Sequence, residues 1–203
     1  MHQLLNKTFK TAALLGALTM MGAVQAGPTP SLKRVSGGLG VLDTSTGLEW
    51  LQDWNLAGKT MTWSEADLWV KGLNASNYAG HNDWRLPNTN TTASSNCAVN
   101  VNPGGGFAQQ YYGYNCTGSE MGHLFYNALG GEAGQSILDP AGDTVDEIAN
   151  LALFKNVQYS GYWSGTEYAP NSDRAWIFYT SVGYQIHFGK VFRMHSLAVR
   201  RGG

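Results

Sequence analysis

The chain of 203 residues is close to neutral, with 13 lysines and arginines against 14 aspartates and glutamates, so it lacks the basic excess of nucleic-acid-binding proteins. Only 13% of its residues are charged, whereas 26 glycines and 12% aromatic residues favour short strands and tight turns packed by large rings. The length fits one well-buried domain and is too short for two comfortable ones.

The first 26 residues have the features of a secretory signal peptide. Lys7 and Lys10 precede an apolar run over residues 12–24, and a small-residue ending predicts cleavage near Ala26. The run is shorter than the roughly 20 apolar residues that a membrane-spanning helix needs. We therefore expect a secreted or periplasmic protein without stable membrane insertion.

A polar leader and a hairpin are predicted next. Residues 27–38 are rich in proline, glycine and polar side chains, which predicts a flexible leader, and residues 39–203 are expected to form a single domain. The domain opens with two apolar runs on either side of residues 43–47, Asp-Thr-Ser-Thr-Gly. These turn-forming residues predict a β-hairpin.

Two main helices are predicted. In residues 60–74, Thr62 and Glu65 form a capping-box pattern before an apolar stripe at helical spacing. In residues 119–131 a second apolar stripe ends at two glycines, and His123 falls on the opposite side, which predicts a solvated surface histidine and not a ligand. The stripes consist of Trp63, Ala66, Trp69, Val70 and Leu73 in the first helix and Met121, Leu124, Phe125, Ala128 and Leu129 in the second.

The segment between the helices, residues 88–118, has no periodicity and reads as a long loop. It contains both cysteines of the chain, Cys97 and Cys116, which predict a disulfide in an oxidising compartment. Its tyrosines lie beside asparagines, a composition typical of adaptable recognition surfaces; the alternative is that they pack the loop against the domain. These tyrosines are Tyr111, Tyr112 and Tyr114.

The C-terminal third alternates between apolar and polar residues. It predicts a short strand in residues 162–170, a hairpin in residues 174–188 and a closing strand in residues 197–200. No acid follows Asp173, so neighbouring strands could form a basic patch suited to sulfate or carboxylate groups; the alternative is a set of ordinary solvated strand ends. The candidate ligand-binding residues are Arg174, Lys190 and Arg193, joined below neutral pH by His187 and His195, with Arg200 and Arg201 nearby.

The stretch HNDWRLPN, residues 81–88, concentrates chemically distinctive side chains. Pro87 disfavours helix at the preceding residue, so the stretch should be extended. Trp84 would then be buried on one face, while Asp83 and Arg85 would form a local pair on the other. No second carboxylate or activated nucleophile accompanies them, so we interpret the stretch as a structural motif and not as a reaction centre.

Other templates for catalysis and metal binding are missing from the sequence. There is no nucleophile elbow, zinc-protease helix, phosphate-binding loop or dinucleotide fingerprint. The acidic run over residues 139–147 does not have the spacing of a calcium loop, so a solvated acidic loop is the default interpretation. The sequence therefore predicts no enzyme, no resident metal and no cofactor.

The order of the parts is informative as a whole: DTSTGLEWLQD, TWSEA, HNDWRLPN, SEMGHLFYNALGG, YWSGTEYAP with AWIFY, and LAVRRGG. From about Val41 to Gly203 it resembles the family of secreted bacterial domains named after the C-terminal domain of the Legionella collagen-like adhesin. The resemblance implies a C-type-lectin-like α+β fold of short antiparallel strands and hairpins, akin to formylglycine-generating enzymes, which share Arg85-Leu86-Pro87 and a terminal Arg-Gly-Gly. It also implies a role outside the cell or in its envelope, where the namesake attaches to sulfated polysaccharides and forms trimers.

The chain departs from these relatives in two respects. It has no collagen-like repeat, which leaves its oligomeric state open, and it lacks paired cysteines near its C-terminus for oxidase chemistry. The leading hypothesis is a non-enzymatic binding module for glycans, including anionic sulfated polysaccharides, or for a surface protein. The alternatives are an enzyme on the formylglycine-generator scaffold and a structural subunit of the envelope.

Overall fold

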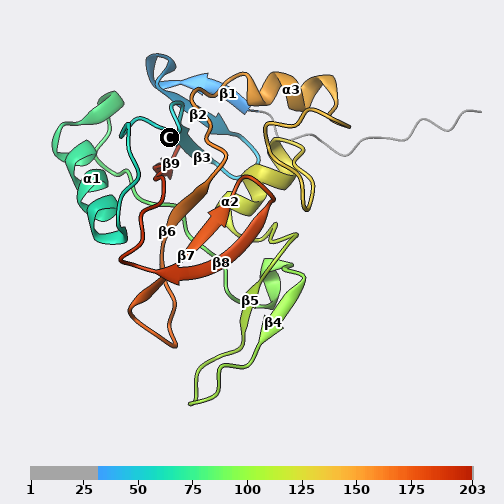
Figure 1. Cartoon of the computed structure of the whole chain (residues 1–203). Coiled ribbons are helices and arrows are strands. Elements are labelled where there is room, and N and C mark those ends of the chain that lie inside the picture. The colour runs from blue at the N-terminus through green and yellow to red at the C-terminus, as the bar shows by residue number, and fades with distance from the viewer. Residues whose placement is uncertain (1–31, 203) are drawn as a thin grey trace, which may run out of the picture.

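The structure, a computed structural model, describes residues 32–202 of the chain. Three α-helices and three small antiparallel sheets make up this part, so the fold class is α+β, as predicted (Figure 1). The predicted signal peptide, residues 1–26, lies outside the described residues. Within residues 32–202, no helix has the length and apolar character required to cross a bilayer.

The first sheet joins the two ends of the described chain. Its strand order is β1-β2-β3-β9, and every neighbouring pair is antiparallel. The predicted first hairpin is confirmed by β2 and β3, and the predicted closing strand by β9, which pairs with β3 (Figure 1). The strands are β1 (Leu32–Val35), β2 (Gly40–Asp43), β3 (Leu48–Leu51) and β9 (Val199–Arg201).

The predicted flexible leader is wrong for residues 32–38. Strand β1 pairs with β2 along its whole length, and a 3-10 turn, Ser36–Gly38, connects the two strands. Leu32 is buried in the core, while Lys33 and Arg34 are exposed. A single buried side chain among polar neighbours leaves little hydrophobic pattern, because an edge strand is held mainly by backbone hydrogen bonds to its neighbour.

Helix α1 (Trp63–Ala75) confirms the first helix prediction. The Glu65 backbone N–H donates to Thr62 Oγ1 at 3.3 Å, and the Thr62 N–H donates to Glu65 Oε2 at 2.8 Å, so the capping box forms in both directions. Ala66, Val70 and Leu73 are buried against the core. The helix therefore offers one face to the domain and leaves the other to solvent.

The second helix is shorter and wider than predicted. Helix α2 (Glu120–His123) continues directly into one π-helical turn, Leu124–Ala128. The apolar stripe of the prediction is buried, and Gly130, at φ +73°, ends the helix as expected. His123 is not solvated as predicted, because its Nε2 lies 3.3 Å from the buried Asp43 carboxylate.

A crosslinked hairpin replaces the predicted unstructured loop. Strands β4 (Val99–Val101) and β5 (Gln110–Tyr112) pair antiparallel, and the Cys97–Cys116 disulfide joins their outer ends, as predicted. We call residues 97–116 the tyrosine hairpin. It projects from the body of the domain (Figure 1) and docks on β8 through paired backbone hydrogen bonds between Gly113 and Gln185. The strands are short and mostly exposed, so they leave no hydrophobic alternation in the sequence.

Removal of the disulfide is expected to lower stability by about 3 kcal/mol, because the bond closes a 19-residue separation and restricts the unfolded chain. The Cys97→Ser and Cys116→Ser double variant should unfold at a lower urea concentration and be cleaved faster by protease within the tyrosine hairpin. Urea denaturation and mass spectrometry of the fragments measure both effects. Unchanged stability and an unchanged cleavage pattern would contradict the prediction.

The third sheet, in the order β6-β7-β8, forms the centre of the domain. The predicted strand in residues 162–170 and the predicted hairpin in residues 174–188 are both present in it. The side chains of Trp176, Ile177 and Phe178 on the middle strand β7 are buried on both faces. The acidic run ends in a helix α3 (Val145–Leu151) that is capped by Thr144 and Glu147. No group of three or more potential metal ligands is close enough within residues 32–202 to hold an ion. The strands are β6 (Gly161–Glu167), β7 (Arg174–Tyr179) and β8 (Tyr184–Gly189).

Candidate functional site

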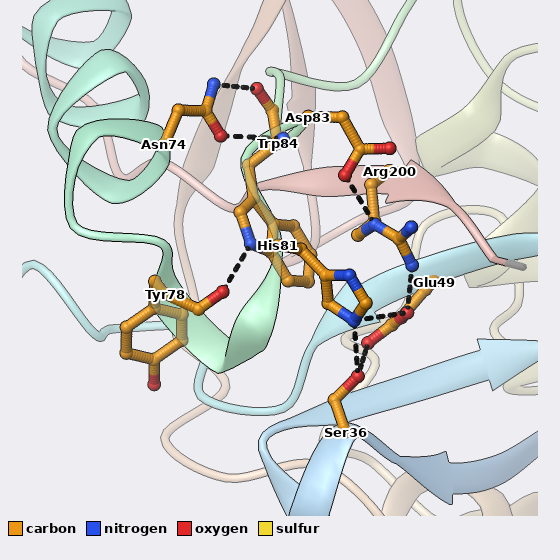
Figure 2. A network of polar contacts seen from close by, with 8 residues as sticks. All are labelled: Ser36, Glu49, Asn74, Tyr78, His81, Asp83, Trp84 and Arg200. Atoms are coloured by element: carbon orange, nitrogen blue, oxygen red, sulfur yellow. Dashed lines mark hydrogen bonds and ion pairs between the residues drawn. The ribbon is translucent and has the colours of Figure 1, made fainter.

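The HNDWRLPN stretch forms a structural junction between α1 and β9. Trp84 is buried, and its Nε1–H donates to the Tyr78 carbonyl at 3.0 Å. Asn74 of α1 holds the Trp84 backbone from both sides, donating to its carbonyl at 2.9 Å and accepting from its N–H at 2.8 Å (Figure 2). Arg85 exchanges two backbone hydrogen bonds with Val199 of β9. These contacts give the stretch a structural role.

The predicted pair between Asp83 and Arg85 is wrong. Arg85 forms a bidentate ion pair with Glu120, in which both N–O distances are 2.7 Å. Asp83 instead accepts a hydrogen bond from Nε of Arg200 at 2.6 Å. Residues two apart on an extended segment lie too far along the chain to compete with opposite charges on neighbouring elements. Pro87 is buried beside them, and its carbonyl accepts from Gly165 at 2.9 Å, which ties the junction to β6 as well.

The predicted basic patch is largely neutralised by glutamates. Lys190 Nζ lies 2.8 Å from Glu167 Oε1 and 4.3 Å from the centre of the Trp63 ring. Arg193 pairs with Glu65 at 3.0 Å. Both glutamates belong to elements that precede the acid-free C-terminal stretch, so counting charges along the chain could not show the pairing.

The predicted protonation of His187 below neutral pH is also wrong. Burial of the ring and the nearby Arg174 guanidinium lower the pKa of His187 to about 4. Arg174 Nε donates to His187 Nδ1 at 2.8 Å, and Tyr168 stacks on the imidazole with ring centres 3.7 Å apart. Burial lowers the pKa of His195 too. His187 therefore adds no charge to the patch under mildly acidic conditions.

The lowered pKa of His187 predicts a pH-dependent stability. The unfolded histidine, with a pKa of 6.5, takes up a proton before the folded one, with a pKa of about 4. Stability is therefore complete above pH 6.5 and falls as the pH drops between these values. We expect a loss of about 2 kcal/mol from this residue, since partial exposure of the ring reduces the full effect.

Urea denaturation at a series of pH values measures this loss. The His187→Gln variant, which cannot be protonated, should show a flatter stability profile than the wild type between neutral and mildly acidic pH. If the stability of His187→Gln fell with pH as steeply as that of the wild type, His187 would not be the source of the pH dependence.

The three predicted tyrosines gather on the tyrosine hairpin. Tyr111 and Tyr112 are partly exposed, and Tyr114 retains 36% of its exposure while meeting Tyr184 of β8 edge-on at 4.8 Å. The exposed amides of Asn100 and Gln109 lie across the strand pair beside them, and the Tyr111 hydroxyl donates to Gln109 at 3.3 Å. Alternation along β5 places Tyr111 beside these amides on one face of the tyrosine hairpin and Tyr112 on the other face, near Tyr114 and Tyr184. The disulfide holds the base of the hairpin.

The surface of the tyrosine hairpin is also uncharged. Residues 86–119, between Arg85 and Glu120, contain no lysine, arginine, histidine, aspartate or glutamate. The sequence itself carries this signal as an unbroken run without charge. An uncharged surface with partly exposed rings suits a ligand that is itself uncharged and polar.

Comparison with known proteins identifies the family. The chain matches the family model of the Lcl C-terminal domain over residues 40–200. Neither the curated proteins nor the solved structures give a significant match, so the likeness to C-type lectins stays a prediction. The matched range contains the structural junction and the tyrosine hairpin, and it extends from the start of β2 into β9. The protein therefore belongs to the Lcl C-terminal domain family.

Proposed function

We propose that the protein is a secreted or periplasmic, non-enzymatic module that binds uncharged polysaccharide through the tyrosine hairpin. The observation that carries the proposal is a rigid, crosslinked surface of tyrosines and amides without a single charge. Tyrosine rings cover the apolar faces of sugar rings at low conformational cost, and amides and phenol hydroxyls bond to sugar hydroxyls.

The location of the protein is inferred from two features. Residues 1–26 have the pattern of a secretory signal peptide, and the Cys97–Cys116 bond is typical of proteins in oxidising compartments. The same bond counts against the alternative of an oxidase on this scaffold, because both cysteines of the chain are joined in it. The side chains of the HNDWRLPN stretch are also engaged in contacts that hold the fold together.

The structure favours an uncharged ligand over a sulfated one. A sulfate group would compete with Glu167 for Lys190 and with Glu65 for Arg193. Arg174 is turned toward His187, which has a lowered pKa and stays neutral. Contacts with a sulfated chain would in addition weaken as salt rises, whereas stacking on the tyrosine hairpin would not.

Affinity electrophoresis through gels that contain polysaccharides tests the proposal. Dextran and dextran sulfate form a matched pair that differs in charge, and mannan, xylan and laminarin extend the neutral set. We expect at least one neutral polysaccharide to retard the protein equally at low and high salt. Tyr111→Ala and Tyr114→Ala should each weaken retardation about fivefold, the loss of one ring contact.

Tyr159→Ala is the matched control, because Tyr159 is 67% exposed and lies outside the tyrosine hairpin. It should be retarded like the wild type. The proposal would be overturned if dextran sulfate alone retarded the protein, if this retardation decreased as salt rose, and if the tyrosine variants were retarded like the wild type. The absence of retardation by every neutral polysaccharide would also overturn it.

A further inference from the structure

A separate polar pocket opens on the first sheet. This sheet lies away from the tyrosine hairpin (Figure 1). Its volume is about 480 Å³. We call it the seam pocket, because strands from the beginning and the end of the described chain meet there. It is lined by the polar side chains Ser36, Glu49, His81 and Arg200 and by the apolar Val35 and Leu42.

Glu49 is the fixed centre of the seam pocket. The side chain is almost fully buried, and Oε2 accepts from Nη1 of Arg200 at 2.6 Å. Position 40 on the neighbouring strand is glycine, and any side chain there would collide with the Glu49 carboxylate. Burial lowers the pKa of Arg200, but hydrogen bonds with Asp83 and Glu49 outweigh burial and raise it, so the guanidinium is permanently charged.

A serine and a histidine complete the pocket wall. Ser36 Oγ donates to Glu49 Oε1 at 2.5 Å and lies 3.0 Å from His81 Nε2 (Figure 2). Ser36 adopts a φ of +52°, a left-handed conformation that is uncommon for serine and costs conformational energy. The strained backbone places this hydroxyl between a carboxylate and an imidazole.

The charges around the seam pocket nearly cancel. Glu49 and Asp83 oppose Arg200, and the exposed Lys33 lies in the same cross-strand row, opposite Leu42. In the pocket wall itself the Glu49 carboxylate is paired with the Arg200 guanidinium, so neither an anionic nor a cationic ligand meets an unopposed charge. The wall offers acceptors on the carboxylates and donors on the guanidinium and imidazole, so the best complement is a group that both donates and accepts.

We propose that the seam pocket binds the hydroxyl groups of a single uncharged sugar residue. The Ser36 hydroxyl already lies between Glu49 and His81, and this is the arrangement that we expect for a bound sugar hydroxyl. The inference extends the proposed function to a second site, and it stands on residues that the tyrosine hairpin does not share. One chain would then contact polysaccharide at two places.

Histidine side-chain NMR of the full chain tests the seam pocket directly, with methyl glycosides of glucose, mannose, galactose and N-acetylglucosamine as probes. At least one glycoside should shift the His81 ring signal in a saturable way, while the signals of His123 and His187 stay in place. The His81→Gln variant assigns the signal. Because His81 faces the pocket, the shift reports occupancy at this site and not at the tyrosine hairpin.

Two variants and one control sharpen the test. Ser36→Ala should weaken glycoside binding about fivefold, the loss of one hydrogen bond, and Leu42→Trp should fill the pocket and abolish the shift. Ser45→Ala is the matched control: Ser45 also lies between a carboxylate, Asp43, and a histidine, His123, but it does not line the pocket. It should bind like the wild type.

The proposal fails if no glycoside gives a saturable His81 shift, or if methylammonium shifts the signal and the glycosides do not. It also fails if both Ser36→Ala and Leu42→Trp bind as the wild type does. Tyr114→Ala separates this proposal from the proposed function, since it should leave the His81 shift intact even if no polysaccharide is retarded by the tyrosine hairpin.

Discussion

Arg200→Ala is expected to destabilise the protein by about 3–5 kcal/mol, because it leaves a buried carboxylate without its cation. Arg200 bonds to Glu49 and to Asp83, both at 2.6 Å, and its side chain keeps only 11% of its exposure. The Glu49 carboxylate would then have to stay buried with Ser36 as its remaining hydrogen-bond donor at close range. Urea denaturation monitored by tryptophan fluorescence measures the loss.

Arg201→Ala provides the control for this prediction. Arg201 is the next residue on β9 and is exposed, so its replacement should change stability by no more than about 0.5 kcal/mol. A Glu49→Leu and Arg200→Met double variant should recover most of the loss, since it removes both charges from the interior. Equal stability of Arg200→Ala and Arg201→Ala would show that the pair does not hold β9 to β3.

Trp84→Ala is the second substitution with a large expected effect, about 3–5 kcal/mol. It empties a fully packed site and also removes the hydrogen bond to Tyr78. Trp84→Phe should cost less, because it keeps a ring in the core. Thermal unfolding followed by circular dichroism measures both, with the partly exposed Trp69→Ala as a control of milder effect.

This prediction also tests the interpretation of HNDWRLPN as a structural junction. Variants of Asp83 and Arg85 should lose stability together with any binding, because each side chain anchors a different element. A folded Asp83 or Arg85 variant of wild-type stability that had lost turnover of a substrate would instead make the stretch a reaction centre. The ion pairs with Arg200 and Glu120 would then have to be reassigned.

Local patterns in the sequence predicted the elements whose cause is local. The capping box of Thr62 and Glu65 needs only four consecutive residues, and it starts α1 as expected. The disulfide followed from two cysteines in a chain with a signal peptide pattern. The π-helical turn at Leu124 was missed, because its apolar stripe is the same as that of an α-helix.

Partners distant in the sequence were not predictable in the same way. Arg85 meets Glu120 and Asp83 meets Arg200, 35 and 117 residues away, and only the strand register brings these charges together. The seam pocket was missed for the same reason. Ser36 falls in the predicted leader, and Glu49 meets Arg200 only because β9 pairs with β3.

The pairing of β9 with β3 has a consequence for folding kinetics. The first sheet cannot close until the last strand of the described chain, Val199–Arg201, has been released from the ribosome or a translocation channel. Until then Glu49 lacks Arg200, and contacts of such long sequence separation form slowly. The first sheet is therefore completed only after the central sheet β6-β7-β8 has left the ribosome.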